Sequence, residues 1–561
     1  AAMTDETQTE RTAIPLPDDF PVQWPSEDDG QQTWHRDTHH RPDPIPPLEA
    51  DFWHASRNGW RNAQEILGTE PLYDSGNLCI NGYLYGSGQA TVTGAEKEAA
   101  KKRNEVRIDE AIDAMERRWQ QEWQPEIQGY LSSWDDFDLD GTPLADLDTH
   151  LGETWQHLDR IWAIHFAIVH PAYGAMRKLA EYYEELFEDY EEKQDPFAAQ
   201  RLFQAMPNLT VEMGHALWDL SRQAVQNTEL SDLLNDPTCT LESLQVSPHG
   251  QDFATALDRY LDCYGRRPPT WTLSHPTWRE NPAPVLKNLR EYLRPGTRDP
   301  RAEMEKLAAE RDESIAATRA KLAGFPQPAR ERFEKLLHLA QIGMILSEDH
   351  GVYIDFGVTA RVRYVLLACG RRLAKAGALA EADDVFFLHY DEVRAALLSD
   401  PMPEQRALSA ERRASFEHFS TVTPPNRLGC EPPPKEKPEN KKDEPADEPG
   451  ILRGNPCAPG VARGRVRILR SMTDTDALQP GEVMVATTTN PSFTPLFSTI
   501  AALLTLTGGK LSHGAVVARE YRIPAVLGVK DIFDKLSNGQ LVEVDGTAGT
   551  IRLIDTQEEN A

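Results

Sequence analysis

Apolar residues recur at steps of three and four through most of the first 380 positions, which is the spacing of amphipathic helices. One such series is Trp155, Leu158, Ile161, Trp162 and His165. The same spacing predicts helices over residues 96–124, 208–226, 252–264, 284–293, 303–323, 329–346 and 362–376. Alternating residues over 78–92 are the one strand signal in the first 420 positions, and they predict a short β-hairpin. We therefore predict a large, mainly α domain that carries a small hairpin.

The helical pattern ends at residues 424–450, which are rich in Pro, Glu and Lys and have almost no apolar side chain. This composition predicts an extended tether, and about 25 residues could reach on the order of 75 Å. Beyond it, strand-like runs at 464–469, 483–487, 501–506 and 541–544 surround one helix at 513–520, which predicts a compact β/α module. The fold class is thus multidomain, with a flexible N-terminus (1–30), a mainly α domain (31–423), a linker (424–450) and a mobile β/α module (451–556).

A histidine stands at the predicted start of the helix in this module, after an apolar strand and a Gly-Gly turn. The segment reads Thr507-Gly508-Gly509-Lys510-Leu511-Ser512-His513-Gly514. Backbone N–H groups and the positive dipole end of a helix favour a phosphoryl group on such a ring. A neutral imidazole is a competent nucleophile near pH 7, and the N–P bond that it forms is labile. The alternative is that Ser512 caps the helix and that His513 is an ordinary surface residue.

The run Thr-Gly-Gly-x-x-Ser-His-Gly-Ala-Val-Val-Ala-Arg-Glu, followed by 523–526, resembles the swivelling phosphohistidine domain of the phosphoenolpyruvate-utilising family. The likeness extends from residue 454 to about residue 553. The resemblance implies that His513 is phosphorylated as a covalent phosphohistidine intermediate. It also implies that the phosphohistidine loop is shaped by Thr507, Gly508, Gly509, Ser512 and Gly514.

A carrier histidine needs a phosphate donor. The sequence has no glycine-rich phosphate loop followed by Lys, and no βα repeat that could build an eightfold barrel. We therefore expect the phosphate to come from ATP on a separate ATP-grasp subunit, with Mg²⁺ around the nucleotide.

Four further regions resemble the substrate domain of rifamycin phosphotransferase, and more closely the large subunits of two-component phenol- and cresol-phosphorylating synthases. They are 39–42 with 46–48, 274–280, 347–350 with 353–355, and 383–388. The resemblance implies an ATP-dependent, dikinase-type phosphotransferase subunit that acts on the hydroxyl of a small phenolic compound such as phenol or 4-cresol. The alternatives are an antibiotic (rifamycin-like) phosphotransferase component and a non-catalytic phosphocarrier or regulatory subunit.

Transfer to a hydroxyl needs a base and cations for the phosphoryl group. Glu348, Asp349 and His350 end one predicted helix, and Arg361 and Arg363 open the next. We expect His350 or Glu348 to accept the proton and Arg363 to bind phosphate bidentately, with Asp349 and Arg361 at the substrate. The alternative is that these charges are solvated helix ends.

Other basic residues are second candidates for the same tasks. His39 and His40 could act as the base, and Arg266 and Arg267 could bind phosphate. His35 and His39 have the H-x3-H spacing of zinc ligands, but the prolines that follow disfavour a helix, so no metal site is predicted.

Charge and cysteine content restrict partners and location. Lys and Arg total 59 against 89 Asp and Glu, for a formal charge of -30, which disfavours nucleic acid and anionic membranes as partners. No apolar run reaches the roughly 18 residues needed to span a bilayer. The 6 cysteines have no paired or metal-like spacing, so we expect a reduced, cytoplasmic setting.

Overall fold

A computed structural model describes residues 12–38, 40–188, 195–268, 271–400, 402–432, 450–470, 474, 477–489 and 491–554. The chain forms two compact units. Unit 1 comprises Ala1–Arg57, Pro71–Lys101 and Leu367–Ala446, and unit 2 comprises Asn58–Glu70, Lys102–Leu366 and Asp447–Ala561. None of the described helices combines the length and the hydropathy needed to span a bilayer.

Unit 1 is built on a four-stranded antiparallel sheet in the order β2-β3-β1-β4. Its strands are β1 (Thr33–Arg36), β2 (Tyr73–Ile80), β3 (Tyr83–Ala90) and β4 (Arg427–Gly429). The predicted hairpin is β2-β3, whose two-residue turn is Asn81-Gly82 with φ of 52° and 85°. Asn-Gly is the pair that best tolerates two positive φ angles, so this turn fixes the register of the hairpin.

Three predictions for unit 1 are wrong. Strands β1 and β4 were missed, and β4 lies within the range predicted to be linker, where it pairs with β1. Residues 12–30 were expected to be flexible, yet Phe20 is fully buried against Trp34 and Leu428. The prolines near residue 45 do not exclude a helix, because Pro47 occupies the first position of α2 (Pro47–Leu67), where no N–H is needed.

The other helices of unit 1 lie before β1 and between β3 and β4 in the chain. They are α1 (Glu27–Gly30), the 3-10 helix η4 (Ala382–Phe387), α15 (Tyr390–Leu398) and α16 (Arg406–Ser420). The last predicted helix, at 362–376, corresponds to α14 (Thr359–Lys375), so α15 and α16 were also missed.

The helical part of unit 2 contains the long helices predicted from the apolar spacing. Its elements are α3 (Gly94–Arg118), the π-helix η1 (Trp119–Trp123), α4 (Gln124–Asp135), α5 (Leu144–Leu186), α6 (Ala198–Arg201), α7 (Leu209–Val225), α8 (Thr228–Asn235), α9 (Leu241–Val246), α10 (Gln251–Tyr264), α11 (Ala283–Leu293), α12 (Pro300–Leu322), α13 (Gln327–Gly351) and the π-helix η3 (Val352–Val358).

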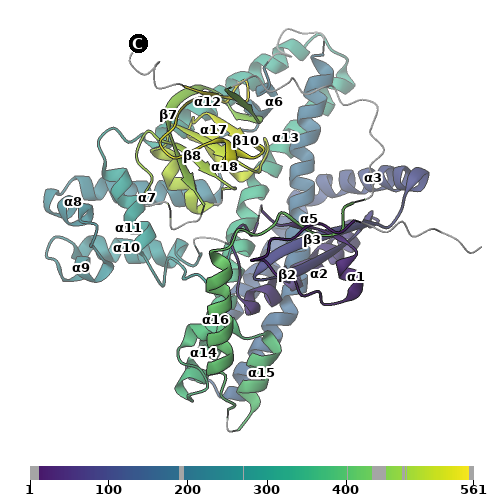
Figure 1. Ribbon diagram of the computed structural model, residues 1–561. Helices are drawn as coiled ribbons and strands as arrows, with labels where there is room; N and C mark the ends of the chain where they lie inside the picture. Colours follow the sequence, from purple (N-terminus) through teal and green to yellow (C-terminus); the bar gives the residue numbers. More distant parts are fainter. Residues whose placement is uncertain are drawn as a thin grey trace, which may run out of the picture. The chain divides into compact units, whose positions relative to one another are not determined.

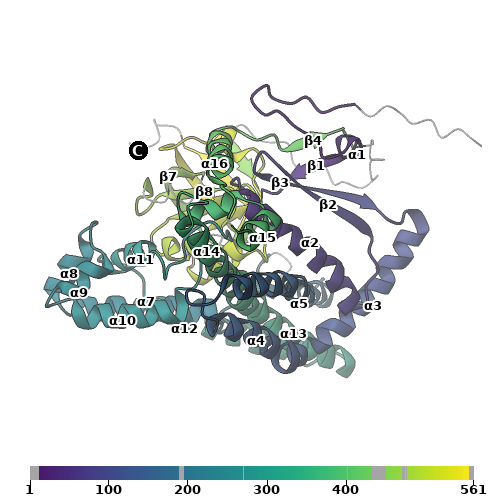
Figure 2. The same cartoon turned by 90° about the horizontal axis from the view of Figure 1, so that it is seen from below.

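Helices α5 and α13 run side by side in both views (Figures 1 and 2). A Cβ on Gly343 would lie 2.6 Å from the carbonyl oxygen of Ala172, so glycine permits this close approach. The helices share an apolar cluster that includes Met176, Leu179 and Met344. This pair is the support on which the candidate site is built.

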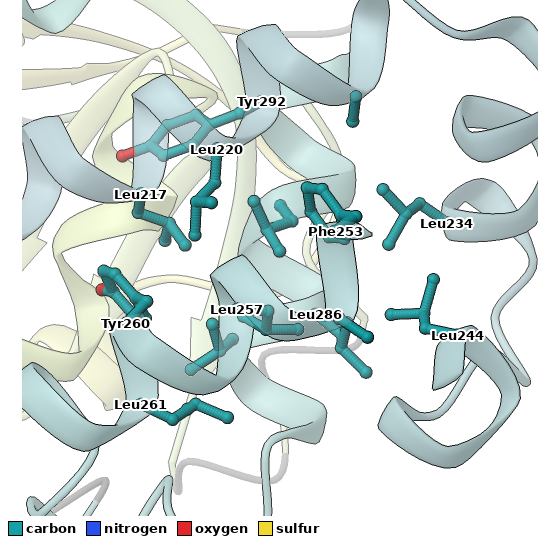
Figure 3. Packing of buried hydrophobic residues seen from close by; sticks show 14 of the residues in the cluster. Leu217, Leu220, Leu234, Leu244, Phe253, Leu257, Tyr260, Leu261, Leu286 and Tyr292 are labelled. Atoms are coloured by element: carbon teal, nitrogen blue, oxygen red, sulfur yellow. The ribbon is translucent and has the colours of Figure 1, made fainter. Parts of the chain in front are cut away.

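A second apolar cluster joins α7 to the short helices α8–α11. Figure 3 shows side chains of α7, α10 and α11 pointing toward one another, among them Leu217, Leu257 and Leu286. Trp278 and Tyr292 are also fully buried there. The tryptophan thus fills the core rather than lining an open pocket.

The C-terminal part of unit 2 is the predicted β/α module. Its elements are β5 (Ile451–Arg453), β6 (Asn455–Ala458), β7 (Val461–Leu469), β8 (Val483–Ala486), η6 (Pro491–Ser498), β9 (Ala502–Thr505), α17 (His513–Glu520), β10 (Ala525–Leu527), α18 (Ile532–Lys535), β11 (Leu541–Asp545) and β12 (Thr550–Leu553). The sheet order is β5-β12-β11-β7-β8-β9-β10-β6, with β7 to β10 parallel. Strands β8 and β9 are buried at every position, as parallel strands covered on both faces are.

Candidate active site

The turn before His513 is held in place by its own residues. Thr507 Oγ1 donates to the carbonyl of Thr487 (3.0 Å), which fixes the end of β9. Gly508 has a φ of 123°, a conformation that a residue with a Cβ rarely adopts. The chain therefore reverses here and enters α17 with His513 as its first residue.

Ser512 and Gly514 flank His513 and have different roles. Ser512 occupies the N-cap position, but its Oγ donates to the carbonyl of Gly509 (2.8 Å) and does not cap α17, so the predicted cap is wrong. A Cβ on Gly514 would lie 2.3 Å from Thr489 Oγ1, so this position needs glycine for α17 to pack on the sheet.

Arg519 fixes the same loop from the far end of α17. Its Nη1 donates to the carbonyls of Lys510 and Cys457, both at 2.8 Å. Burial lowers the pKa of Arg519 to about 10. Because both acceptors are backbone carbonyls, Arg519 is a positioning residue for the loop.

His513 faces the helical part of unit 2 and is not enclosed in its own module. Its Nδ1 lies 3.4 Å and 3.5 Å from the two carboxylate oxygens of Glu348, near the end of α13. The two side chains are 13% and 10% exposed. The other ring nitrogen, Nε2, is buried and has no hydrogen-bond partner among the described residues. The arrangement favours a proton on Nδ1 and leaves the lone pair of Nε2 for a phosphoryl group.

Further contacts hold the module against the helices. Val516 on α17 joins the apolar cluster of α5 and α13. Lys510 Nζ donates to the carbonyl of Pro196 (3.3 Å), and Arg298 Nη1 donates to that of Tyr521 (3.2 Å). Arg522 pairs with Glu303 (3.2 Å) and Glu310 (2.6 Å) on α12. Apart from Val516, the contacts named here are polar, which suits a module that docks reversibly.

The three residues at the end of α13 do not share one role. Asp349 accepts a hydrogen bond from the backbone N–H of Leu209 (2.8 Å) at the start of α7, and burial raises the pKa of Asp349 to about 6. His350 is buried, and its Nδ1 donates to the carbonyl of Leu346 (2.7 Å). Of the three, only Glu348 contacts His513 in the described structure. The role of Asp349 is different: through its hydrogen bond to the N–H of Leu209 it holds the start of α7 in place.

The structure does not support phosphate binding by Arg363, because its donors are already used. Arg363 is 3% exposed, bonds both carboxylate oxygens of Glu280 and donates to the carbonyls of Leu273 and Ser274. Arg361 forms two bonds with Asp135 (3.0 and 2.6 Å). Both arginines hold elements of the helical part together.

Arg266 and Arg267 are adjacent but lie in different environments. Arg266 has a 41% exposed side chain 3.7 Å from Asp135. Arg267 is 4% exposed and lies over the rings of Phe356 (4.1 Å) and Trp278 (4.8 Å). Its Nε and Nη2 are buried without a hydrogen-bond partner in the part of the chain that is described. Such a cation is a candidate for binding an anion.

The charge of Arg267 is linked to the site around His513. Burial lowers the pKa of Arg267 to about 10, and the charges of Tyr260 and Glu348 act in the opposite direction. Glu348 therefore lies beside His513, and its charge also reaches Arg267. The sequence could not separate Arg267 from Arg266, because burial alone distinguishes them.

The two N-terminal histidines considered as bases are His39 and His40. His39 lies outside the described residues. His40 belongs to unit 1, has a 61% exposed side chain and lies 3.2 Å from Asp37.

A small hollow of about 40 Å³, open to solvent, lies between the module and α7 and α12. Its lining includes Val517, Glu520 and Tyr521 of the module together with Thr210, Val211, His215, Arg298, Glu303 and Met304. His513 does not line it, so we do not assign it as the acceptor site.

Glu520 lies at the edge of this hollow, and its environment predicts that folding stability depends on pH. Burial raises the pKa of Glu520 to about 8; the charge of Glu348 adds to this shift and that of Arg519 opposes it. The folded chain then holds a proton that the unfolded chain, with a carboxyl pKa near 4.5, releases. Stability should therefore fall as pH rises from about 5 to 8.

The variant Glu520→Gln is expected to lose this dependence. The difference in unfolding free energy between variant and wild type should change by up to about 1.4 kcal/mol per pH unit within that window. Urea denaturation at pH 5, 6, 7 and 8 measures it, with the exposed Glu331→Gln as a charge-matched control. Parallel pH profiles for Glu520→Gln and wild type would contradict the prediction.

Comparisons with known proteins match two regions of the chain. Residues 165–348 match the rifampicin phosphotransferase fourth domain, and residues 478–549 match the mobile domain of PEP-utilising enzymes. His165 and Glu348 are the end points of the first region, and His513 lies within the second.

The chain is also similar to parts of several curated proteins. The chain is 33% identical to the chondramide synthase cmdD of Chondromyces crocatus over 98% of its length, but over only 15% of that protein. It is 30% identical to the uncharacterized phosphotransferase YvkC of Bacillus subtilis (70% of this chain, 47% of the relative). It is 31% identical to the rifampicin phosphotransferase of Streptomyces sviceus (64% and 41%). The chain spans less than half of each relative. Within the C-terminal module, residues 478–549 are similar to the PEP-utilising enzyme mobile domain, and His513 is the first residue of α17 there.

Proposed function

We propose that this chain is a phosphotransferase component that carries a phosphoryl group on Nε2 of His513 and transfers it to a hydroxyl group of an organic acceptor. The observation that carries the proposal is the contact between His513 and Glu348. It places a histidine of the mobile domain against the helical part, with Nε2 buried and without a partner among the described residues.

The transfer step makes one bond and breaks one. The acceptor oxygen attacks phosphorus, the P–Nε2 bond breaks and a P–O bond forms. With a proton on Nδ1, the leaving group is a neutral imidazole. Glu348 would hold that proton by a hydrogen bond while the carrier is free. In-line attack places the acceptor oxygen beyond Nε2, on the side of the ring away from Nδ1, so Glu348 would leave the ring to accept the hydroxyl proton of the acceptor as the P–O bond forms. We prefer Glu348 to His350 as the base, since His350 faces away toward Leu346 and Asp355.

Arg267 would bind the phosphoryl group during transfer. Charge on a transferring phosphoryl is spread over three oxygens, and a guanidinium can donate to two of them at once. Arg267 offers Nε and Nη2, both buried and without a partner in the described chain. In a site that excludes water, such donors act most strongly on the charge of the transition state.

ATP on an ATP-grasp subunit, with Mg²⁺, would load His513 elsewhere. The mobile-domain match supports a carrier that visits two sites, and the sequence has no phosphate loop of its own. In this proposal the linker provides the reach; most of it, 433–449, lies outside the described residues.

The acceptor hydroxyl could belong to a rifamycin-type antibiotic or to a small phenol. The rifampicin phosphotransferase domain match and the rifampicin phosphotransferase relatives support a rifamycin-type hydroxyl better than phenol or 4-cresol. The phenolic acceptor therefore becomes the second candidate.

Direct loading of the histidine tests the proposal without the donor subunit. Phosphoramidate phosphorylates histidine, and peptide mapping by mass spectrometry should find acid-labile phosphate on His513. The loaded chain is then offered rifampicin, phenol and 4-cresol separately, with phosphate release into buffer as the blank. Product with rifampicin alone supports the antibiotic acceptor, and product with the phenols supports the second candidate. Loaded His513 that transfers to none of these acceptors would favour a non-catalytic carrier.

A further inference from the structure

A second cluster of chemically active side chains lies near the end of α13 and is not used by the proposed transfer. It consists of His165 on α5, His350 on α13 and Asp355 in the π-helix η3. One ligand atom from each residue lies within 4.8 Å of the others. His165 Nδ1 is 3.1 Å from one oxygen of Asp355, and His350 Nε2 is 3.9 Å from the other.

His350 is oriented as metal-binding histidines are. Its Nδ1 donates to the carbonyl of Leu346, so Nε2 presents a lone pair toward Asp355. Bonding of the second ring nitrogen to a backbone carbonyl is the usual way in which a protein fixes the tautomer of a ligand histidine. The side chain of His350 is 6% exposed, so few other groups can reach this nitrogen.

His165 provides an independent observation. Its Nδ1 is buried and makes no hydrogen bond within the described chain, although a carboxylate oxygen is 3.1 Å away. The two imidazole rings are also close, with centroids 4.9 Å apart at 61°. A buried nitrogen without a hydrogen bond is costly, and a cation bound between the two rings and the carboxylate would satisfy it.

The local backbone places the carboxylate of Asp355 beside His165 and His350. A π-helix widens the turn after α13, and such turns occur often at functional sites. A Cβ on Gly351 would lie 3.3 Å from Asp355 Oδ2, so glycine at this position leaves room for the carboxylate.

We propose that His165 Nδ1, His350 Nε2 and Asp355 bind one divalent transition-metal ion of the zinc or cobalt type, with at least one open coordination position. Two imidazoles and one carboxylate suit Zn²⁺, Co²⁺ or Fe²⁺, whereas Mg²⁺ and Ca²⁺ prefer oxygen ligands. The ion would tie α5, α13 and η3 together. His350 and Glu348 are two residues apart on one helix, so they project to different sides, and metal binding can be measured apart from phosphoryl transfer.

The full chain, stripped of metal with a chelator, is titrated with Co²⁺ while the visible spectrum is recorded. We expect one equivalent of Co²⁺ to bind, with absorption bands typical of nitrogen and oxygen ligation, and Zn²⁺ to displace it. Melting temperature should rise with the bound ion. Absence of a saturable Co²⁺ spectrum in the wild-type chain would overturn the proposal, whatever the behaviour of variants.

Matched variants locate the ion. Removing a residue that only hydrogen-bonds a metal ligand costs about 10–100-fold in metal affinity. Removing a ligand itself should cost more, so His165→Gln and Asp355→Asn should each lower the Co²⁺ affinity by at least about 100-fold. His338→Gln, an exposed substitution on α13, should bind as wild type. Circular dichroism confirms that each variant folds. Equal affinity for wild type, His165→Gln and Asp355→Asn would place the ion elsewhere and refute the site.

Discussion

Glu348→Gln is expected to accept phosphate on His513 as the wild type does, but to pass it to an acceptor hydroxyl about 10²–10⁴ times more slowly. Glutamine keeps the size of the side chain and an oxygen that can accept the Nδ1–H of His513, but it cannot take up the proton of the acceptor. The measurement is a single-turnover chase: the chain is loaded with phosphoramidate, the acceptor is added, and phosphohistidine is quantified over time.

The control for this experiment lies on the same helix. Glu331→Gln makes the same chemical change on the exposed part of α13, where Gln327 donates to Glu331 (2.7 Å), and it should transfer as wild type. If Glu348→Gln reduced the loading of His513 as much as the transfer, Glu348 would only orient the carrier. Transfer at the wild-type rate would remove Glu348 as the base.

Arg267→Met should reduce transfer by about 10²–10³-fold, the usual effect of removing one donor to transition-state charge. Methionine fills a similar volume against Phe356 and Trp278 but cannot donate to phosphate. Because it replaces an unpaired buried charge, the variant should be as stable as wild type or more so. Stopped-flow or quench-flow transfer rates and thermal melting, measured on the same samples, check both statements.

The neighbour of Arg267 provides the matched control. Arg266→Met changes the same residue type one position earlier, where the side chain is exposed and near Asp135, so transfer should be unchanged. A large loss of stability in Arg267→Met would indicate a structural arginine. Equal transfer rates for the two variants would exclude Arg267 as the phosphate ligand.

Several features were predictable because the signal lies within a few turns of chain. The helix expected at 208–226 is α7, Leu209–Val225, with Asn208 capping it through a bond from Val211. Strands β8 and β9 and helix α17 were placed to within about two residues, because apolar runs and a Gly-Gly turn separate them. The position of His513 at the start of a helix after a glycine turn was predicted for the same reason.

Other features depend on partners far away in the sequence. Strands β1 and β4 have 4 and 3 residues, too few to show an alternating pattern. Strand β1 pairs with β3, and β4 pairs with β1 across about 390 positions. Arg361 and Arg363 were expected at a substrate because they are cationic. Their carboxylate partners, Asp135 and Glu280, are not adjacent in sequence and could not be seen.

The amino-acid sequence by itself determined where most of the long helices run and which histidine is the candidate carrier, because amphipathic spacing and the loop before His513 are local properties. The tertiary structure alone decided which side chains meet that histidine. It brought Glu348 to Nδ1, buried Arg267 but not Arg266, and joined His165 to His350 and Asp355. The direction in which a side chain points and the degree to which it is buried depend on how distant helices pack. No single segment of the chain contains that information.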